Sequence, residues 1–324
     1  MNGGIVKPPV VVLGYSRANT LVLSLGSLSR CYDFEGRDIF LFLDAPYKEE
    51  HRSDTDKVYE TALRLKKDFL PQLKIIKRER NYGVPGNLLS AVTEVVNKYG
   101  SVIFFEDDVL VSRTFLRYMD GALSAYRTDK RIWGVNGYQS PYLRVPKKYS
   151  HGVYLNPRHY PWGFGTWADR WNAVDFDLKN WPEERDNPFV RALIDVQGGD
   201  MWGMIDGQYR GLITTWDVQC SCYMAKSQMY SIEPRYSLTK NIGFMSPIAV
   251  HCKGRNLAIQ NQYYYNFEPK KYPVGLKPDS DLLRLFRHQW IDPSFRGRVI
   301  RKMIRIMALF RRHTNEPCEI LSNY

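Results

Sequence analysis

The sequence predicts an α/β fold in which a mostly parallel β-sheet is flanked by helices. Over the first hundred residues, short apolar runs alternate with segments of helical periodicity, the pattern of parallel strands joined by helical crossovers. The length of 324 residues, with 44% hydrophobic side chains, is enough for one large domain with a substantial core.

Four strands and three helices can be placed in order along this part of the chain. The apolar runs predict buried strands at 10–13, 39–43, 73–76 and 101–105, and Pro46 prevents extension of the second strand. Helical periodicity predicts helices at 19–29, 53–70 and 87–98. A turn at 83–86 would precede the third helix, and Asn87 is a candidate for its N-cap.

Polar residues follow three of these strands where each one ends. Ser16 and Arg17 follow the first strand, Asp44 follows the second, and the acidic triplet Glu106-Asp107-Asp108 follows the fourth. In open α/β sheets, ligands bind outside the carboxyl ends of the strands. These residues are therefore expected to converge on one crevice.

Three consecutive carboxylates resist ionising together unless a cation compensates them. A hard divalent cation such as Mn²⁺ or Mg²⁺ binds carboxylate oxygens and keeps positions open for phosphate oxygens. The alternatives for an acidic triplet are an exposed loop or a helix cap. Its position directly after a buried strand favours the metal site.

The triplet and several later segments, in this order, resemble GT-A-fold inverting glycosyltransferases related to N-acetylglucosaminyltransferase I, and bacterial family 2-like glycosyltransferases. The resemblance covers about residues 10–255. It rests on the run 101–111 with its Glu-Asp-Asp version of the Asp-x-Asp motif, the following helix (Phe115, Leu116, Tyr118), 132–137, the aromatic-glycine acceptor loop 162–167, Trp216-Asp217, 233–237, 241–243 and His251.

The resemblance implies a GT-A, Rossmann-like fold and a role for each donor-site residue. Ser16 and Arg17 would contact the nucleotide, and Asp44 would read its uracil or ribose. Glu106 and Asp107 would face the donor sugar and the ribose. From the residues alone, Asp44 could instead be a cap and Arg17 a solvated surface cation.

The resemblance also implies the metal ligands and the base. Asp108 would bind the metal directly, and His251 would contact metal or phosphate from a closing loop, unless it is structural. Asp217 is the predicted general base that takes the proton of the acceptor hydroxyl; its alternative role is an N-cap. Asn87 would either bond the nucleotide or cap its helix.

The predicted function is therefore metal-dependent, inverting transfer of a hexose, such as GlcNAc, from a nucleoside-diphosphate donor with UDP as the expected nucleotide. A nucleotidyltransferase acting on a sugar phosphate is an alternative, although the turn after the first strand lacks the expected Gly-rich loop. A non-catalytic glycan-binding or nucleic-acid-binding protein is another. No nucleic-acid-binding motif accompanies the net charge of +12, so nucleic acid is not an expected partner.

The predicted catalytic domain spans 1–265, with a nucleotide-binding half at about 1–110 and an acceptor half at 111–265. Residues 133–215 are rich in Trp, Tyr, Gly and Pro. This composition suits either an aromatic sugar-binding cleft or an aromatic core beneath long loops.

Residues 266–324 are predicted to be a basic C-terminal extension, with 12 Lys and Arg against 5 Asp and Glu from residue 270 onwards. Cations at 298, 301, 302, 305 and 312 alternate with apolar residues at helical spacing, which favours docking on an anionic membrane over packing on the domain. A lipid-linked or glycan acceptor in bacterial surface polysaccharide synthesis would fit this position. Five cysteines without paired spacing, and no signal-peptide pattern, favour the cytoplasm, with peripheral binding to the inner face of the plasma membrane.

Overall fold

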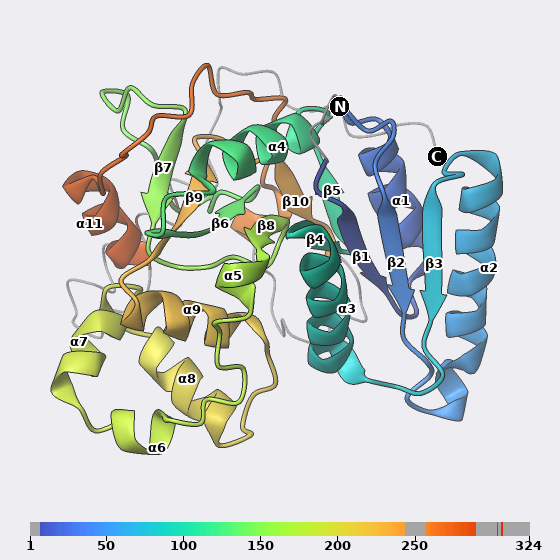
Figure 1. The fold of residues 1–324 in the computed structure, drawn as a ribbon, viewed down its shortest axis with the longest axis horizontal. Coiled ribbons are helices and arrows are strands. Elements are labelled where there is room, and N and C mark those ends of the chain that lie inside the picture. The colour runs from blue at the N-terminus through green and yellow to red at the C-terminus, as the bar shows by residue number, and fades with distance from the viewer. Residues whose placement is uncertain (1–6, 244–256, 290–302, 304–305, 307–324) are drawn as a thin grey trace.

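The computed structural model describes residues 7–243, 257–289, 303 and 306. These residues form a central eight-stranded sheet with helices on both faces (Figure 1). The predicted α/β fold is confirmed. Within the described residues, no helix is long and apolar enough to cross a membrane.

The strand order across the sheet is β3-β2-β1-β4-β8-β6-β9-β7. The four strands from β3 to β4 are parallel, as are β6 and β9, whereas β8 and β7 run antiparallel to their neighbours. The bounds are Val10–Gly14 for β1, Ile39–Leu43 for β2, Leu73–Lys77 for β3, Ser101–Glu106 for β4, Ile132–Asn136 for β6, Val153–Asn156 for β7, Phe164–Trp167 for β8 and Tyr230–Pro234 for β9.

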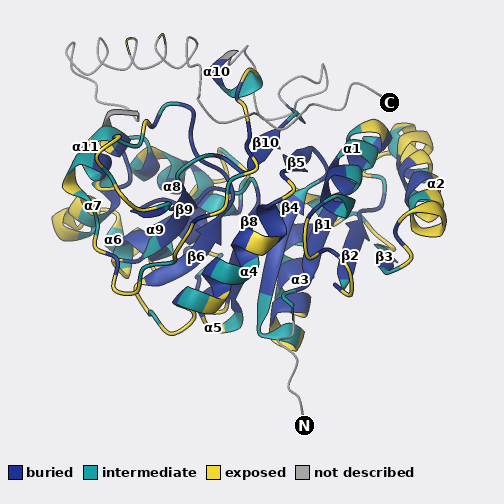
Figure 2. Ribbon diagram, turned by 90° about the horizontal axis from the view of Figure 1, so that it is seen from above, coloured by how far each residue is buried: buried dark blue, intermediate teal, exposed yellow. Residues whose placement is uncertain are grey.

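The four strands of the parallel half agree with their predicted positions to within one residue. β1 and β2 are buried along their whole length, as Figure 2 shows for the centre of the sheet. A strand covered on both faces must be a continuous apolar run, and such a run is easy to recognise in a sequence.

Helices cover each face of the sheet and bury an apolar cluster against it. One face carries α1 (Ala18–Ser29), α2 (Arg52–Asp68) and α4 (Phe115–Tyr126), with the short helix η1 (Glu49–His51) preceding α2. The other face carries α3 (Gly83–Tyr99), α5 (Ala168–Trp171) and α9 (Asp217–Lys226). The layers therefore position the N-terminus of α1 beside the end of β1.

The start of α3 differs from the prediction. The helix begins at Gly83, so the residues expected to form a turn are its first turn, and Pro85 is tolerated there because the first turn needs few backbone donors. Asn87 lies inside the helix and is not its cap.

The segment predicted to be an acceptor loop contains β8, a buried strand between β4 and β6. Gly165 is required in this strand because a Cβ there would lie 2.9 Å from Leu123 Cδ1 of α4 and 3.2 Å from the carbonyl oxygen of Val102. The aromatic residues of this region mainly fill the core, since the side chains of Trp133, Trp167, Trp171 and Trp181 are fully buried.

Three short helices form a lobe beside α9: α6 (Trp181–Glu184), α7 (Pro188–Asp195) and α8 (Met201–Tyr209). They bury their own apolar cluster, which includes Trp181, Ile194 and Ile205. A separate two-stranded antiparallel sheet joins β5 (Val109–Val111) to β10 (Thr239–Asn241). This small sheet directly follows the acidic triplet and lies against α1.

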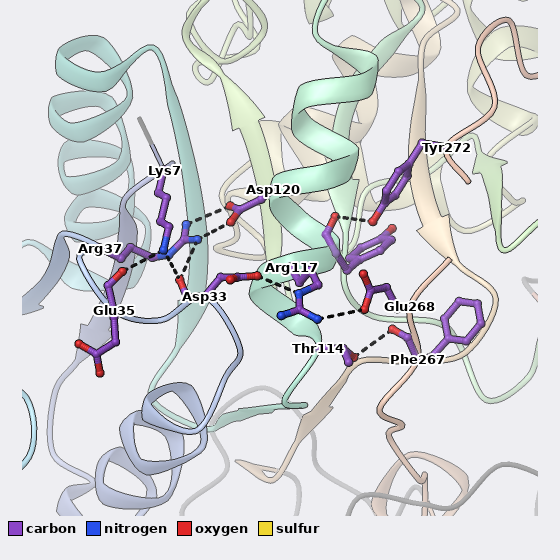
Figure 3. Close-up of polar contacts among 11 residues, drawn as sticks. Lys7, Asp33, Glu35, Arg37, Thr114, Arg117, Asp120, Phe267, Glu268 and Tyr272 are labelled. Atoms are coloured by element: carbon purple, nitrogen blue, oxygen red, sulfur yellow. Dashed lines mark hydrogen bonds and ion pairs between the residues drawn. The ribbon is translucent and has the colours of Figure 1, made fainter. Parts of the chain in front are cut away.

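Residues 257–289 contain α10 (Leu257–Gln260) and α11 (Ser280–Gln289), and residues between these two helices contact α4. Figure 3 shows the ion pair between Arg117 and Glu268. The Tyr272 hydroxyl donates a hydrogen bond to the Tyr118 carbonyl oxygen. Gly121 leaves room for the Tyr272 ring. Residues beyond the predicted domain boundary at 265 thus contact the domain that precedes it.

Candidate active site

The carboxyl ends of β1, β2 and β4 meet at one edge of the sheet and carry the predicted site residues. Leu13 of β1 pairs with Glu106 of β4 in parallel register, and the Asp44 amide donates a 3.2 Å hydrogen bond to the Gly14 carbonyl oxygen. Ser16 is half-buried in the turn between β1 and α1. The fold therefore brings the three predicted strand ends side by side.

The acidic triplet lies at the centre of this edge. Glu106 ends β4, and Asp107 and Asp108 form the turn before β5, where both residues are buried. Burial, together with the two neighbouring aspartates, raises the pKa of Glu106 to about 8. Burial also raises the pKa of Asp107 to about 7, against the opposing effect of Arg17. Ionising the whole triplet would therefore place more negative charge here than its surroundings compensate.

Arg17 bridges two of the three carboxylates. Its Nη2 donates to Asp107 Oδ1 at 2.6 Å and its Nη1 donates to Asp108 Oδ2 at 2.8 Å. The arginine immediately precedes α1, and its carbonyl oxygen accepts hydrogen bonds from the amide of Leu21 and the hydroxyl of Thr20. The backbone is thus anchored by the helix while the guanidinium faces the triplet.

Asp108 is held by the segment that follows β10. The Ile242 amide donates to the Asp108 carbonyl oxygen at 2.8 Å, and Gly243 packs so closely that a Cβ there would lie 2.9 Å from Asp108 Cγ. Asp108 Oδ1 is buried and accepts no hydrogen bond from the described residues. A buried carboxylate oxygen without a donor is a candidate ligand atom for a cation.

The triplet fits a hard divalent cation in charge and in donor type. If all three carboxylates were ionised, they would exceed the one guanidinium by two negative charges, and carboxylate oxygens suit Mn²⁺ or Mg²⁺. In the described part of the chain, no three His, Cys, Asp or Glu side chains form a ready-made metal cluster. A cation here would therefore be held by Asp108 and would take further ligands from a bound phosphate group or water.

Asp217 lies near the triplet, at the start of a different element. It is the first residue of α9, does not cap it through its side chain, and is close enough for its charge to contribute to the raised pKa of Glu106. The preceding Trp216 is 4% exposed, and its ring packs against Phe104 and Phe164 at centroid distances of 5.8 and 5.4 Å. This packing fixes the start of α9 and therefore the position of the Asp217 backbone.

Asp44 organises the neighbouring strand end. Its Oδ1 accepts hydrogen bonds from the amides of Ala45 at 3.0 Å and Tyr82 at 2.9 Å, and burial raises the pKa of its carboxyl group. The side chain therefore ties the loop after β2 to the start of α3. Its position at the end of β2, next to β1, suits the predicted contact with a nucleoside.

Asn87 is buried on α3, and its Oδ1 accepts a 3.0 Å hydrogen bond from Arg78 Nε. The Arg78 guanidinium lies over the rings of Phe42 and Tyr82, at 4.7 and 5.0 Å from their centroids. The hydrogen bond from Arg78 gives Asn87 a structural role. The contact between Asn87 and the nucleotide stays a prediction.

Two predictions fall outside the described residues. His251, the second predicted metal contact, lies in 244–256. The basic helix predicted at 298–312 is described only at Met303 and Ile306, which are 56% and 45% exposed. Membrane docking through this helix stays a prediction.

A buried polar cluster around Glu233 was missed from the sequence. Glu233 of β9 is fully buried and accepts hydrogen bonds from the Tyr154 hydroxyl and from the side-chain amides of Asn136 and Asn156. Burial raises its pKa to about 7. The only sequence signal was a single acidic residue within a strand whose other residues are mostly uncharged.

No family model matches the chain, and no curated protein matches its sequence. Among solved structures, S. aureus TarS 1–349 is similar at 12% identity and a TM-score of 0.39, over 70% of this chain and 60% of that one. Its complex with UDP-GlcNAc is similar at 16% identity and a TM-score of 0.33, over 49% and 44% of the two chains. The galactosyltransferase LgtC, in complex with donor and acceptor sugar analogs, is similar at 13% identity and a TM-score of 0.35, over 65% and 68%.

The chain thus spans 60% or less of the TarS structures named above. Similarity with TM-scores of 0.33 to 0.39 does not decide an activity.

Proposed function

We propose that the chain is an inverting glycosyltransferase that moves a hexose from a nucleoside-diphosphate donor to a hydroxyl group of an acceptor. The observation that carries this proposal is that Arg17 pairs with Asp107 and Asp108 of the triplet, with Asp217 close enough for its charge to act on Glu106. The set combines a cationic group for a diphosphate, carboxylates for a divalent cation, and a carboxylate for proton transfer. Metal-dependent, inverting glycosyl transfer uses all three.

The donor would lie along the ends of β1, β2 and β4. Ser16 and Arg17 at the start of α1 would face the diphosphate, where the helix N-terminus also favours an anion. Asp44 would contact the nucleoside, with UDP as the expected nucleotide. Glu106 and Asp107 would face the donor sugar and the ribose.

Mn²⁺ or Mg²⁺ held by Asp108 would stabilise the negative charge that develops on the leaving diphosphate. Asp217 would take the proton of the acceptor hydroxyl while that oxygen bonds to the anomeric carbon. The bond from this carbon to the phosphate oxygen breaks, and its electron pair leaves with the nucleoside diphosphate. Attack from the face opposite the leaving group inverts the anomeric configuration.

The acceptor is proposed to be a glycan or a lipid-linked saccharide in bacterial surface polysaccharide synthesis. The basic segment after residue 270 supports a position at an anionic membrane surface. This part of the proposal depends on residues mostly outside the described ranges. It is tested separately, by vesicle binding of the chain truncated after Lys271.

The first experiment is a panel of UDP- and GDP-sugars assayed for hydrolysis and transfer with and without Mn²⁺. Release of a nucleoside diphosphate that depends on Mn²⁺ supports the proposal. Formation of a nucleotide-sugar from UTP and a sugar phosphate, with no hydrolysis or transfer across the panel, would identify a nucleotidyltransferase and overturn it.

The second experiment tests the base with Asp217→Asn. This variant should lose about 10²- to 10⁴-fold in turnover and keep its UDP affinity, because the amide cannot accept the proton. Asp54→Asn is the matched control, since Asp54 also lies in the first turn of a helix but is exposed on α2. Turnover of Asp217→Asn close to that of the control would contradict the assignment.

A further inference from the structure

Arg17 makes a two-pronged contact with the carboxylate that is proposed to bind the cation and with its neighbour Asp107. Asp108 Oδ2 accepts from Arg17 at 2.8 Å and is covered by Gly243, and Oδ1 is buried. Oδ2 is therefore occupied by Arg17, and Oδ1, which accepts no hydrogen bond from the described residues, is shielded by its burial from a hydrated cation in solvent. As long as the contact lasts, the site is closed.

The contact is strong and local. Hydrogen bonds between ionised partners are about twice as strong as neutral ones, and poor solvation around them strengthens them further. Both aspartates are almost fully buried, whereas the Arg17 side chain is 29% exposed. A ligand arriving from solvent can therefore reach the guanidinium more easily than the carboxylates.

A diphosphate is the natural competitor for this guanidinium. It carries more charge than either carboxylate and offers pairs of oxygens that match the arginine fork. Because the Arg17 backbone is anchored by the first turn of α1, only the side chain needs to turn. Its departure would leave Asp108 uncompensated and able to accept a divalent cation.

We infer that Arg17 is an ion-pair lock: it closes Asp108 to divalent cations in the donor-free protein and opens it when a nucleoside diphosphate draws the guanidinium away. This inference rests on the proposed function for the identity of the ligand. It makes donor and cation binding mutually strengthening, since coupling between two ligands is reciprocal. A cation would then bind mainly together with the donor.

The test measures Mn²⁺ binding by electron paramagnetic resonance, with and without UDP, on the full chain. Arg17→Gln should bind Mn²⁺ about ten- to a hundredfold more tightly than the wild type when UDP is absent, because the lost charged hydrogen bonds no longer compete. UDP should strengthen Mn²⁺ binding at least about tenfold more in the wild type than in this variant.

Two further variants separate the lock from simple charge effects and from misfolding. Arg117→Gln is the matched control, because Arg117 also pairs with two carboxylates, Asp33 and Glu268, in a separate network (Figure 3). It should bind Mn²⁺ as the wild type does. Arg17→Lys keeps the charge but loses the fork, and should still bind Mn²⁺ more tightly than the wild type.

Equal donor-free affinity of the wild type, Arg17→Gln and Arg17→Lys for Mn²⁺ would overturn the lock, whatever the turnover. A gain in Arg17→Gln alone would also overturn it, because that result needs only the loss of charge. If the variants behave as expected but no sugar nucleotide is consumed, the lock stands and the proposed transfer fails.

Discussion

Gly243→Ala is the sharpest single perturbation of the candidate site. An alanine Cβ would lie 2.9 Å from Asp108 Cγ and closer still to Oδ2, inside the 3.0 Å that Cβ atoms essentially never cross. Asn241 Oδ1, at 3.1 Å from the same position, closes the other side. The methyl group must therefore displace either the Asp108 carboxylate or the backbone after β10.

The displacement needed to restore normal contact is about 1 Å, and a misplacement of this size in a catalytic group costs about a hundredfold in rate. We expect Gly243→Ala to lose about that factor in kcat/KM for the donor and to weaken Mn²⁺ binding in the presence of UDP. Its unfolding free energy should also fall, by about 1–3 kcal/mol, because the added methyl group overpacks a buried position.

The assay is donor turnover at several Mn²⁺ concentrations, with urea denaturation as the measure of stability. Gly203→Ala is the matched control: Gly203 lies in α8, and a Cβ added there would meet no atom within 4 Å. The control should keep its activity. Activity of Gly243→Ala within a few-fold of the wild type would show that Asp108 tolerates the shift and is not a precisely held ligand.

Three more predictions test the surroundings of the site. Trp216→Ala should lower the unfolding free energy by about 3–5 kcal/mol in urea denaturation, because it empties a buried aromatic position; a loss below about 1 kcal/mol would place the ring outside the core. Because the folded-state pKa of Glu233 is about 7 against an ordinary 4.5, the folded protein holds more protons in this range, and stability should fall as pH rises from about 4.5 to 7. Over this interval, the unfolding free energy of the wild type should fall by about 3 kcal/mol more than that of Glu233→Gln. Equal pH profiles of the two proteins would show that Glu233 does not titrate with a raised pKa. Gly121→Ala should destabilise the wild type, because its Cβ would lie 2.5 Å from Tyr272 Cε2. In the Tyr272→Ala variant the same change should stabilise the protein by up to about 1 kcal/mol through helix propensity. An effect of the same sign on the unfolding free energy in both backgrounds would contradict this packing.

The parallel half of the fold was predictable because its signals are local. β1, β2 and β4 are apolar runs long enough to be recognised alone, and the polar residues that follow them are adjacent in sequence. The rule that ligands bind at the carboxyl ends of such strands then brought the triplet and Asp44 to one edge.

The start of α3 and the strand β8 were not predictable in the same way. Pro85 and two glycines suggest a turn, and the first turn of a helix accepts all three. β8 is short and contains Gly165, where the side chain of Leu123 from α4 approaches the backbone closely. Only the packed neighbour shows why that residue is there.

The sequence by itself determined the α/β fold class, the positions of the first four strands and the carboxylates that follow them, because each depends on residues close together in the chain. The tertiary structure alone decided that Arg17 bridges Asp107 and Asp108 and that Gly243 covers the second of these. It also decided that Glu233 is buried among amide and hydroxyl donors. These contacts join residues far apart in the chain, and the charge and solvation of each group depend on which distant segments the fold packs against it.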